Sequence, residues 1–420
     1  MYTLVFNSGS SSLKFQLFRV DAKAPVSVLQ GAVRGLGDKA ICEWSYAGKW
    51  ERLSIATGDH DAAARHVLEL LENTADQAQS LLAGVTAIGH RIVHGGDAFS
   101  APTLITDQVL SVLDALSPLA PLHNPPALAV IQTCREYLQD IPMVAVFDSA
   151  FFQTLPDYVR AYALPAEWTK QSQAMRRYGF HGLAHRDMAE RYFAINATAL
   201  TPSRVITVQL GQGCSVAAIR GGRALETSMG FTPLEGLIMA TRPGDVDVGA
   251  MLHLLESGAV TLPELSDGLN HRSGLLGLSG VSGNMQELLA LEAQGHTGAR
   301  LAIEAFCHRA RKYLGAYLAV LGGADAIIFG GGMGEQATAI RERICADMEW
   351  CGLILDTQAN QVAIGVEACI STTDSQLQAY VIPVDEESLI AQDTQHCLKA
   401  WRRALSIKLN EGEDHGTSVK

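Results

Sequence analysis

The sequence has few basic residues and no long uninterrupted hydrophobic run. Its 420 residues include 32 Lys and Arg against 44 Asp and Glu, a formal net charge of −12 at pH 7. An acidic surface repels phosphate backbones and anionic lipid headgroups, so we expect neither a nucleic-acid nor a membrane partner. The most hydrophobic stretch, residues 315–334, is interrupted by Asp325 and rich in glycine. It therefore predicts a helix end, a turn and a strand rather than a membrane span.

The eight cysteines include no C-x-x-C pair and no tight cluster. This spacing argues against a zinc knuckle and against a disulfide framework, and it fits reduced thiols in a cytosol. Residues 1–6 show neither a basic segment nor a long apolar segment of the secretory type. We therefore expect a cytoplasmic protein.

A strand–loop–strand pattern occurs twice in the chain. The first copy has strands at about 2–6 and 13–20 around a loop of small polar residues, and the second has strands at 205–210 and 216–219 around a glycine-rich turn. Strands alternate with helical patterns elsewhere, which indicates an α/β architecture. The length and the hydrophobic content of 48% allow two or three domains. We expect two related α/β domains, each opening with this unit.

Glycine-rich turns stand at three predicted strand ends. Such a turn directs several backbone N–H groups to one place, which suits a phosphate. Either hairpin loop alone is more simply a turn, and neither matches the P-loop pattern. A third cluster, at 330–335, follows a strand and opens a helix, where free N–H groups favour an anion. Three such clusters together favour phosphate binding, and Lys14 directly after the first loop is either a phosphate ligand or solvent-exposed.

Ionisable side chains also lie at predicted strand ends and in Gly/Pro turns, where α/β proteins bind ligands. These residues are Arg91, His123, Asp148, His181 and Arg242. Zinc is an alternative for two histidine pairs, His90 with His94 and His181 with His185. A zinc site needs a third ligand and usually a helix. One pair straddles a glycine and the other lies in a strand pattern, so zinc is the weaker interpretation.

Nine segments, in this order and spacing, closely resemble the acetate kinase family of short-chain acyl kinases. They are NSGSSSLKFQL at 7–17, GHRIVHGG at 89–96, LAPLHNPP at 119–126, VFDSAFF at 146–152, YGFHGLAHRD at 178–187, TRPGDVDVG at 241–249, SGLLGLSG at 273–280, GGGMGE at 330–335 and VDEESLIAQDT at 384–394. The resemblance implies an α/β fold of duplicated actin/hexokinase/Hsp70-type (ribonuclease H-like) domains that flank an interdomain cleft. It implies a first domain of 1–150 completed by about 384–405, a second of 151–383, and a loose tail over 406–420.

The resemblance also implies a reaction, the reversible, Mg²⁺-dependent transfer of the ATP γ-phosphoryl group to acetate. Acetyl phosphate and ADP would be the products, propionate would also be accepted, and Mn²⁺ could replace Mg²⁺. By the same resemblance the protein would be a homodimer.

The family motifs assign a role to each matching position. Asn7 and Glu386 would position the metal, and Lys14 would lie near the nucleotide phosphates. Arg91 would bind the carboxylate, Asp148 would be the catalytic acid, and His123, His181 and Arg242 would stabilise the transition state. The nucleotide segments would be Gln209, Leu210, Gly211, Gln212 and Gly213, then Asn284, Met285 and Gln286, and finally Gly331, Gly332, Met333, Gly334 and Glu335. Val93, Leu122 and Pro233 would wall the pocket for the substrate methyl group.

The chemistry and three departures refine these expectations. A carboxylate is already ionised at pH 7, so Asp148 is better interpreted as orienting metal and substrate than as abstracting a proton. Gln212 replaces the usual Asn, and Asn284 and Gln286 replace the Asp and Arg that contact ribose and adenine in the family. Pyrophosphate therefore stays open as an alternative donor.

Two alternatives to an acetate kinase remain. A non-catalytic nucleotide switch of the actin/Hsp70 type would need the phosphate loops but not Arg91, His123 and Asp148 together. A kinase for butyrate or branched-chain carboxylates would need a residue smaller than Val93.

Overall fold

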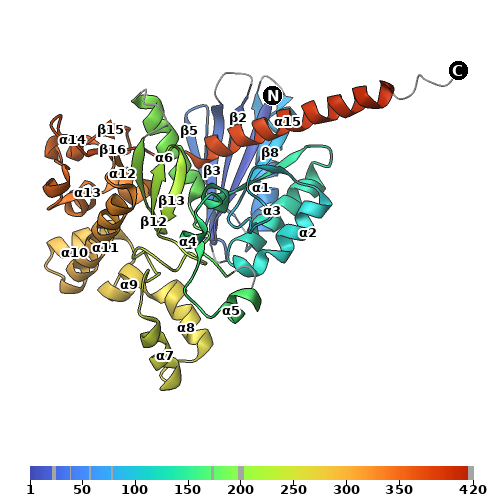
Figure 1. Ribbon diagram of the computed structural model, residues 1–420. Helices are drawn as coiled ribbons and strands as arrows, with labels where there is room; N and C mark the ends of the chain where they lie inside the picture. Colours follow the sequence, from blue (N-terminus) through green and yellow to red (C-terminus); the bar gives the residue numbers. More distant parts are fainter. Residues whose placement is uncertain are drawn as a thin grey trace. The chain divides into compact units, whose positions relative to one another are not determined.

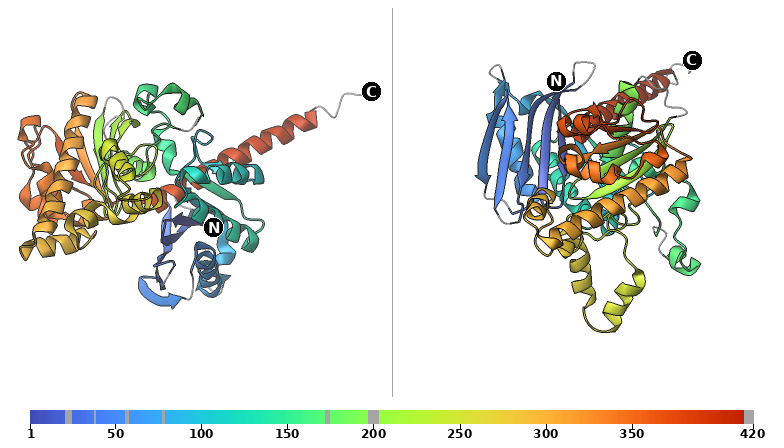
Figure 2. Two further views of the ribbon diagram at one scale, coloured as in Figure 1. Left: turned by 90° about the horizontal axis from the view of Figure 1, so that it is seen from below. Right: turned by 90° about the vertical axis from the view of Figure 1, so that its left-hand side faces the viewer.

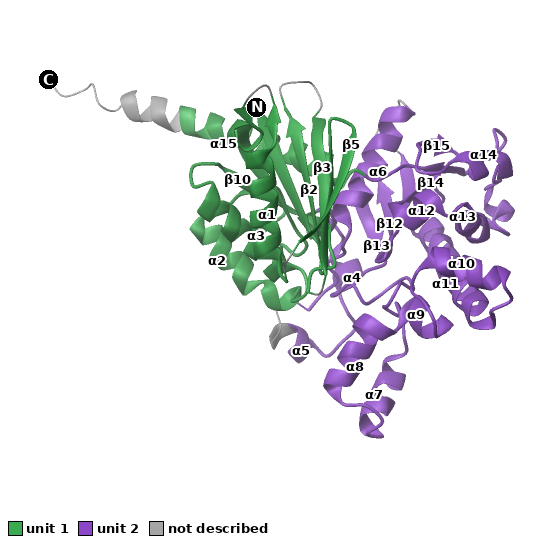
Figure 3. Cartoon of the chain, turned by 180° about the vertical axis from the view of Figure 1, so that it is seen from behind, with its two compact units in different colours: residues 1–150, 385–420 green, residues 151–384 purple. Residues whose placement is uncertain are grey.

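The chain divides into two compact units in the computed structural model, which describes residues 1–20, 25–37, 39–55, 58–76, 79–171, 175–196 and 203–414. Unit 1 comprises residues 1–150 and 385–420, and unit 2 comprises residues 151–384 (Figure 3). Each unit is built around one mixed β-sheet (Figure 1). Among the described helices, none is both long enough and apolar enough to cross a membrane.

The sheet of unit 1 has the strand order β5-β4-β3-β2-β1-β8-β10-β9. Its strands are β1 (Tyr2–Ser8), β2 (Ser12–Arg19), β3 (Val26–Arg34), β4 (Ala40–Tyr46), β5 (Lys49–Ile55), β8 (Val85–Ile92), β9 (Thr103–Leu104) and β10 (Met143–Phe147). Strands β1 to β5 pair antiparallel in sequence, whereas β8 runs parallel to β1 and β10 runs parallel to β8. A short pair, β6 (Ala75–Asp76) and β7 (Gln79–Ser80), lies outside this sheet.

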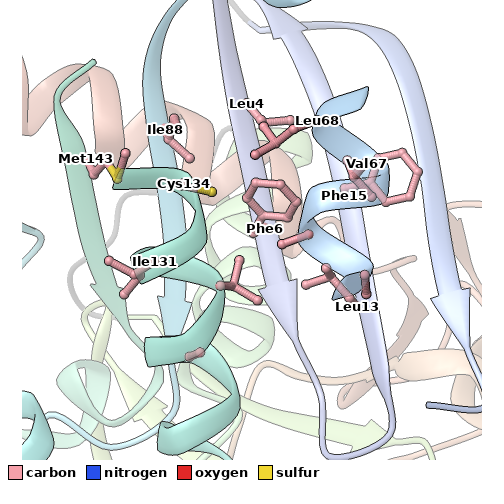
Figure 4. Packing of buried hydrophobic residues seen from close by; sticks show 14 of the residues in the cluster. Leu4, Phe6, Leu13, Phe15, Val67, Leu68, Ile88, Ile131, Cys134 and Met143 are labelled. Carbon is pink, nitrogen blue, oxygen red and sulfur yellow. The ribbon is translucent and has the colours of Figure 1, made fainter. Parts of the chain in front are cut away.

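Alternation along β1 assigns the two faces of this sheet, because successive side chains of a strand point to opposite sides. Leu4 and Phe6 pack with α1 (His60–Asn73) and α3 (Asn124–Tyr137) in the main core (Figure 4). Thr3, on the other face, accepts a hydrogen bond from Gln395 of α15 (Glu386–Asp414). Helix α15 packs on β1, β8 and β10 so closely that a side chain at Gly89 would collide with Thr394. The remaining helical segments are α2 (Asp107–Ala115), η1 (Leu82–Gly84), η2 (Ser117–Leu119) and η3 (Asp148–Phe152), the last of which ends in unit 2.

The sheet of unit 2 has the order β13-β12-β11-β14-β16-β15. Its strands are β11 (Arg204–Leu210), β12 (Cys214–Arg220), β13 (Arg223–Thr227), β14 (Ala326–Gly330), β15 (Ala368–Cys369) and β16 (Gln378–Val381). Helix α11 (Thr297–Leu321) packs along one side (Figure 2), and α6 (Gly182–Ile195) packs on β11 and β14. The other helical segments are α4 (Asp157–Arg160), α5 (Ala166–Gln171), α7 (Val248–Glu256), α8 (Leu262–Asp267), η4 (Gly268–Arg272), α9 (Gly274–Ser279), α10 (Met285–Ala293), α12 (Gly331–Gln336), α13 (Thr338–Cys345), η5 (Glu349–Cys351) and α14 (Thr357–Val362).

The two sheets share one topology. The order β3-β2-β1-β8-β10 in unit 1 corresponds to β13-β12-β11-β14-β16 in unit 2, with the same pattern of antiparallel and parallel neighbours. Helix α15 in unit 1 takes the position that α6 takes in unit 2, on the first strand and its parallel neighbour. The duplicated α/β architecture predicted from the two strand–loop–strand units is confirmed.

The end of the chain differs from its prediction. We expected a loose tail over 406–420, but α15 continues to Asp414. The side chains at 401–406 are exposed, so the polar composition that suggests a loose segment also suits a solvated helix. Residues 415–420 lie outside the described residues.

A fully buried arginine, Arg341 of α13, holds the segment after β14 in place. Its Nη1 donates to the carbonyl oxygens of Gly334 (2.8 Å) and Glu335 (3.0 Å), and its Nε donates to Asn360 Oδ1 (2.8 Å). Its Nη2 reaches the carbonyls of Asn360 (2.9 Å) and Ala363 (2.7 Å). Burial lowers the pKa of Arg341 to about 10. The guanidinium thus supplies donors to carbonyls at the ends of α12 and α14 that helix geometry leaves without partners.

We predict that Arg341→Met lowers the free energy of unfolding by at least about 3 kcal/mol, because it leaves several buried acceptors without a donor. Arg343→Met is the matched control, since Arg343 is 39% exposed and pairs only with Glu292 in the described chain. It should cost about 1 kcal/mol or less. Denaturant titrations of both variants measure the difference, and equal losses would contradict this role for Arg341.

Candidate active site

Three polar side chains lie in a row at the end of the unit 1 sheet. Asn7 of β1 pairs with Lys14 of β2 on one side and with Arg91 of β8 on the other. Neighbours in register share a face of the sheet, and this face is the one that α15 covers. Strand pairing therefore gathers residues that are 84 positions apart in the chain.

Asp148 joins this row from the first position after β10, where it is fully buried. Arg91 Nη2 donates to Asp148 Oδ2 at 2.9 Å, and Arg91 Nη1 donates to Asn7 Oδ1 at 3.3 Å. Burial disfavours the charged form of Arg91, but the nearby carboxylates of Asp148 and Glu386 outweigh that cost and raise its pKa. Arg91 is thus a fixed cation with a planar face, and its side chain is 11% exposed.

The first turn of α15 brings two further carboxylates to the same place. Asn7 Nδ2 donates to Glu386 Oε2 at 2.8 Å and to Glu387 Oε1 at 2.9 Å. Glu387 also pairs with Lys14 at 3.4 Å and raises the pKa of Lys14. Together with Asp148, three carboxylates face two cations, so the cluster carries one surplus negative charge before any ligand binds.

The sequence did not predict a role for Glu387 in this cluster. Glu386 and Glu387 are adjacent in the segment VDEESL, and only the structure shows that their contacts differ. Glu387 contacts both Lys14 and Asn7, whereas Glu386 accepts a hydrogen bond from Asn7.

The buried Asn124 ties the start of α3 to the turn that follows the Arg91 strand. Its side chain donates to the carbonyl of His94 at 3.0 Å and accepts from the His94 backbone N–H at 3.2 Å. His123 immediately precedes Asn124 at the start of α3, and Val93 is buried directly before His94. The bonds between Asn124 and His94 therefore bring the neighbouring residues His123 and Val93 into the same region of unit 1. Leu122, by contrast, is 43% exposed.

Zinc finds no support in this geometry. Within the described part of the chain, no three His, Cys, Asp or Glu side chains are arranged to hold a metal ion. His90 stacks on Phe6 in the core, and burial lowers its pKa to about 3. His181 and His185 both hydrogen-bond to Ser215 Oγ.

In unit 2, the loop between β11 and β12 lies against two of the expected catalytic side chains. A Cβ added at Gly213 would be 2.9 Å from Arg242 Nη2 and 3.1 Å from His181 Nε2. Arg242 Nη1 donates to the carbonyl of Pro233 at 3.0 Å, and burial lowers the pKa of Arg242. His181 has a left-handed backbone (φ 59°) at the start of α6. Gly213, Arg242 and His181 therefore meet in unit 2, with Pro233 as the anchor of Arg242.

The third glycine cluster packs against the end of β11. Gly330 pairs with Gln209, and a Cβ at Gly331 (φ +76°) would lie 2.7 Å from both Gln209 Nε2 and the carbonyl of Leu210. Only glycine fits there, because the backbone is left-handed and the neighbours are close. Glu335 Oε1 accepts from the backbone N–H of Val384 at 3.1 Å, so it also supports the fold.

The segment expected to contact the nucleoside begins helix α10. Asn284 Oδ1 accepts from the backbone N–H groups of Gln286 (2.8 Å) and Glu287 (3.3 Å), which makes it an N-cap. Met285 is buried and Gln286 is exposed. Gln212 lies in the β11–β12 loop, and its carbonyl accepts from Ala240 at 3.1 Å.

The comparisons agree on one family. The sequence matches the model of the Acetokinase family over residues 2–392. The chain belongs to the acetokinase family. An acetate kinase of Bacteroides thetaiotaomicron is 42% identical over 409 residues, covering 95% of this chain and all of that protein. An acetate kinase of Solibacter usitatus is 43% identical over 408 residues, covering 95% of this chain and 98% of that protein.

Solved structures of acetokinase-family enzymes share the fold. Porphyromonas gingivalis acetate kinase superposes with a TM-score of 0.87 at 39% identity, covering 94% of this chain and 99% of that one. A propionate kinase from Francisella tularensis gives 0.86 at 35% identity with the same coverage. The duplicated α/β fold and the resemblance to the acetate kinase family are confirmed, and the protein is a phosphotransferase with a carboxyl group as acceptor.

We predict that Gly213→Ala lowers the turnover of this acetokinase-family enzyme by on the order of 10²-fold, because the added methyl group displaces Arg242 and His181. Gly211→Ala is the comparison, since its nearest neighbours would lie at 3.4 and 3.9 Å. Steady-state rates and thermal unfolding of both variants test this. A Gly213→Ala enzyme that turns over as fast as Gly211→Ala would contradict the packing argument.

Proposed function

We propose that this protein transfers the γ-phosphoryl group of ATP to acetate, giving acetyl phosphate and ADP, reversibly. The observation that carries the proposal is the buried Arg91 guanidinium, held between Asn7 and Asp148 at the end of the unit 1 sheet. A guanidinium fixed in this way can pair with a carboxylate through two parallel hydrogen bonds. The sequence relatives named acetate kinase support acetate as the acceptor.

The proposed chemistry requires charge neutralisation rather than a base. Acetate is ionised at pH 7, so the difficulty is to bring one anion onto another. Arg91 neutralises the incoming carboxylate. Asp148 keeps the guanidinium in place through the 2.9 Å bond, and we therefore assign it an orienting role.

Mg²⁺ is the proposed metal. Proteins bind it through one or two carboxylates, with water and substrate phosphates completing the shell. The donor set fits, because Glu386 supplies a carboxylate, Asn7 supplies an amide oxygen, and the cluster has a surplus negative charge. Mn²⁺ prefers the same oxygen ligands. When bound, the cation neutralises charge on the phosphate oxygens.

The phosphoryl group itself is assigned to Arg242, His181 and His123. Cationic and N–H donors that meet the equatorial oxygens of a transferring phosphoryl group stabilise its transition state. The contact of Arg242 and His181 with the Gly213 loop supports this assignment for unit 2. We assign Gly211–Gly213 and Gly331–Glu335 to the nucleotide phosphates, and Lys14 to the same phosphates from unit 1.

Acetate and propionate differ by one methylene, which is worth about 1–3 kcal/mol in a hydrophobic pocket. Val93, buried beside the Arg91 strand, is our candidate for the wall that meets the substrate methyl, together with Leu122 and Pro233. We expect acetate to be preferred and propionate to be accepted. The likeness to a propionate kinase supports the second half of this expectation.

We further propose a cytoplasmic homodimer. All eight cysteines are free thiols, which suits a reducing compartment. Exposed hydrophobic side chains on α7 and α8, among them Val248 and Leu262, support self-association through unit 2.

Acyl phosphate formation, trapped as the hydroxamate, tests the proposed reaction. We expect product from acetate with ATP, less from propionate, and little from either acceptor with pyrophosphate. The departures at Asn284 and Gln286 make pyrophosphate the competing donor, so product with pyrophosphate but not with ATP would reverse our assignment.

A matched pair of aspartate variants assigns the activity to this site. Asp148→Asn removes the charge that holds Arg91, and we expect a ten- to hundredfold loss, corresponding to about 1.5–3 kcal/mol for a charged hydrogen bond. Asp107→Asn removes a carboxylate that pairs with Arg135 at the surface and should leave the rate unchanged. Near-normal turnover of Asp148→Asn with saturating Mg²⁺ would refute an essential role for Asp148.

A further inference from the structure

Four side chains of unit 2 form an unbroken hydrogen-bonded chain that ends at His181. Thr207 Oγ1 lies 2.7 Å from His185 Nδ1, and His185 Nε2 lies 2.8 Å from Ser215 Oγ. Ser215 Oγ in turn lies 2.8 Å from His181 Nδ1. Thr207, His185 and Ser215 are completely buried. None of these three residues has a role in the reaction proposed above.

The fold explains why these side chains meet. Thr207 on β11 and Ser215 on β12 share one face, because Gln209 pairs with Ser215 and Thr207 stands two residues before Gln209. Helix α6 packs on β11 and carries His185 one turn after His181. The chain thus joins two strands and the beginning of one helix.

The number of hydrogen atoms on these side chains determines which atom donates and which accepts in each hydrogen bond of the chain. Burial lowers the pKa of His185 well below its usual value, so its ring is neutral and carries one N–H. If that hydrogen were on Nδ1, it would point at Thr207, and the hydroxyl hydrogen of Thr207 would need another acceptor. Among the residues that the structure describes, His185 is the only hydrogen-bond partner of Thr207 Oγ1. A buried hydroxyl hydrogen without an acceptor is costly, so Thr207 donates to His185 Nδ1.

The positions of the remaining hydrogens follow from the donation by Thr207. His185 then carries its hydrogen on Nε2 and donates it to Ser215 Oγ. Ser215 donates its own hydroxyl hydrogen to His181 Nδ1. His181 Nδ1 is therefore an acceptor, and in the neutral ring the hydrogen is on Nε2.

We propose that Thr207, His185 and Ser215 are positioning residues that hold His181 in its Nε2–H tautomer. The Nε2 atom is the one that lies against Gly213 beside Arg242. This tautomer presents a neutral N–H donor next to the Arg242 cation, which avoids two like charges at one place. The functional part of this inference rests on the proposed role of His181 toward the phosphoryl group, whereas the tautomer itself does not.

The tautomer is measured on the full-length protein labelled with ¹⁵N-histidine. Two-bond correlations from the ring C–H groups distinguish a protonated ring nitrogen from a bare one, and the His181 signals are assigned by their loss in His181→Gln. We expect a protonated Nε2 and a bare Nδ1 in the wild type. Thr207→Val, of similar shape but without the hydroxyl, should give a mixture of both tautomers, and Thr207→Ser should restore the wild-type pattern. A protonated Nδ1 in the wild type, or a Thr207→Val spectrum identical to the wild type, would overturn the assignment.

Kinetics test the functional part separately. We expect Thr207→Val to lower kcat for acyl phosphate formation about tenfold while the KM values for acetate and ATP change less than about twofold, and Thr207→Ser to recover the rate. An unchanged kcat in Thr207→Val despite mixed tautomers would overturn the functional part. Ser215→Ala breaks the same chain one link nearer to His181 and replaces Thr207→Val if that variant does not fold. A wild-type protein with the expected tautomer but no acyl phosphate activity would refute the proposed function and leave the tautomer assignment standing.

Discussion

The pairing register of β1 with β2 and β8 is the constraint on which the rest of unit 1 depends. It sets Lys14, Asn7 and Arg91 side by side. A slip of one residue in β1 would turn Asn7 toward the hydrophobic core and move Phe6 to the polar face. The register is held because Leu4 and Phe6 must pack with α1 and α3. Burial of hydrophobic side chains on one face thus fixes the charged row on the other.

The corresponding strand positions in unit 2 hold residues of a different chemical type. By strand register, Gln209 takes the place of Asn7, Ser215 that of Lys14, and Gly330 that of Arg91. The row is charged in unit 1 and neutral in unit 2. In unit 2 the missing side chain at Gly331 lets its backbone lie against the end of β11, and the missing side chain at Gly330 leaves room for Met188 and Val384. Ser215 hydrogen-bonds to the two histidines at the start of α6. The same topology therefore places a charged cluster in unit 1 and a row of uncharged residues at the corresponding positions of unit 2.

Much of this could be predicted from the sequence, since glycine turns and ionisable residues at strand ends are local patterns. The duplicated architecture followed from the repeated strand–loop–strand pattern, and the family followed from the resemblance of nine segments. What could not be predicted depends on packing between distant segments. Glu387 looks equivalent to Glu386 until Lys14 is placed beside it. Thr207 is an ordinary strand residue until His185 reaches it from α6, and Arg341 looks like a surface residue of a helix, although it is fully buried. The prediction of a loose segment was wrong for residues 406–414, because polar composition does not distinguish a solvated helix from a loose segment.

We propose that Arg91, held by Asp148 and Asn7, receives the acceptor carboxylate. Steady-state kinetics of Arg91→Lys are the sharpest test, because lysine keeps the positive charge beside Asp148 but loses the planar pair of donors. We expect the KM for acetate to rise at least about tenfold, corresponding to one lost charged hydrogen bond, while the KM for ATP stays within about twofold of the wild type. An unchanged KM for acetate, or an equal rise for both substrates, would contradict it.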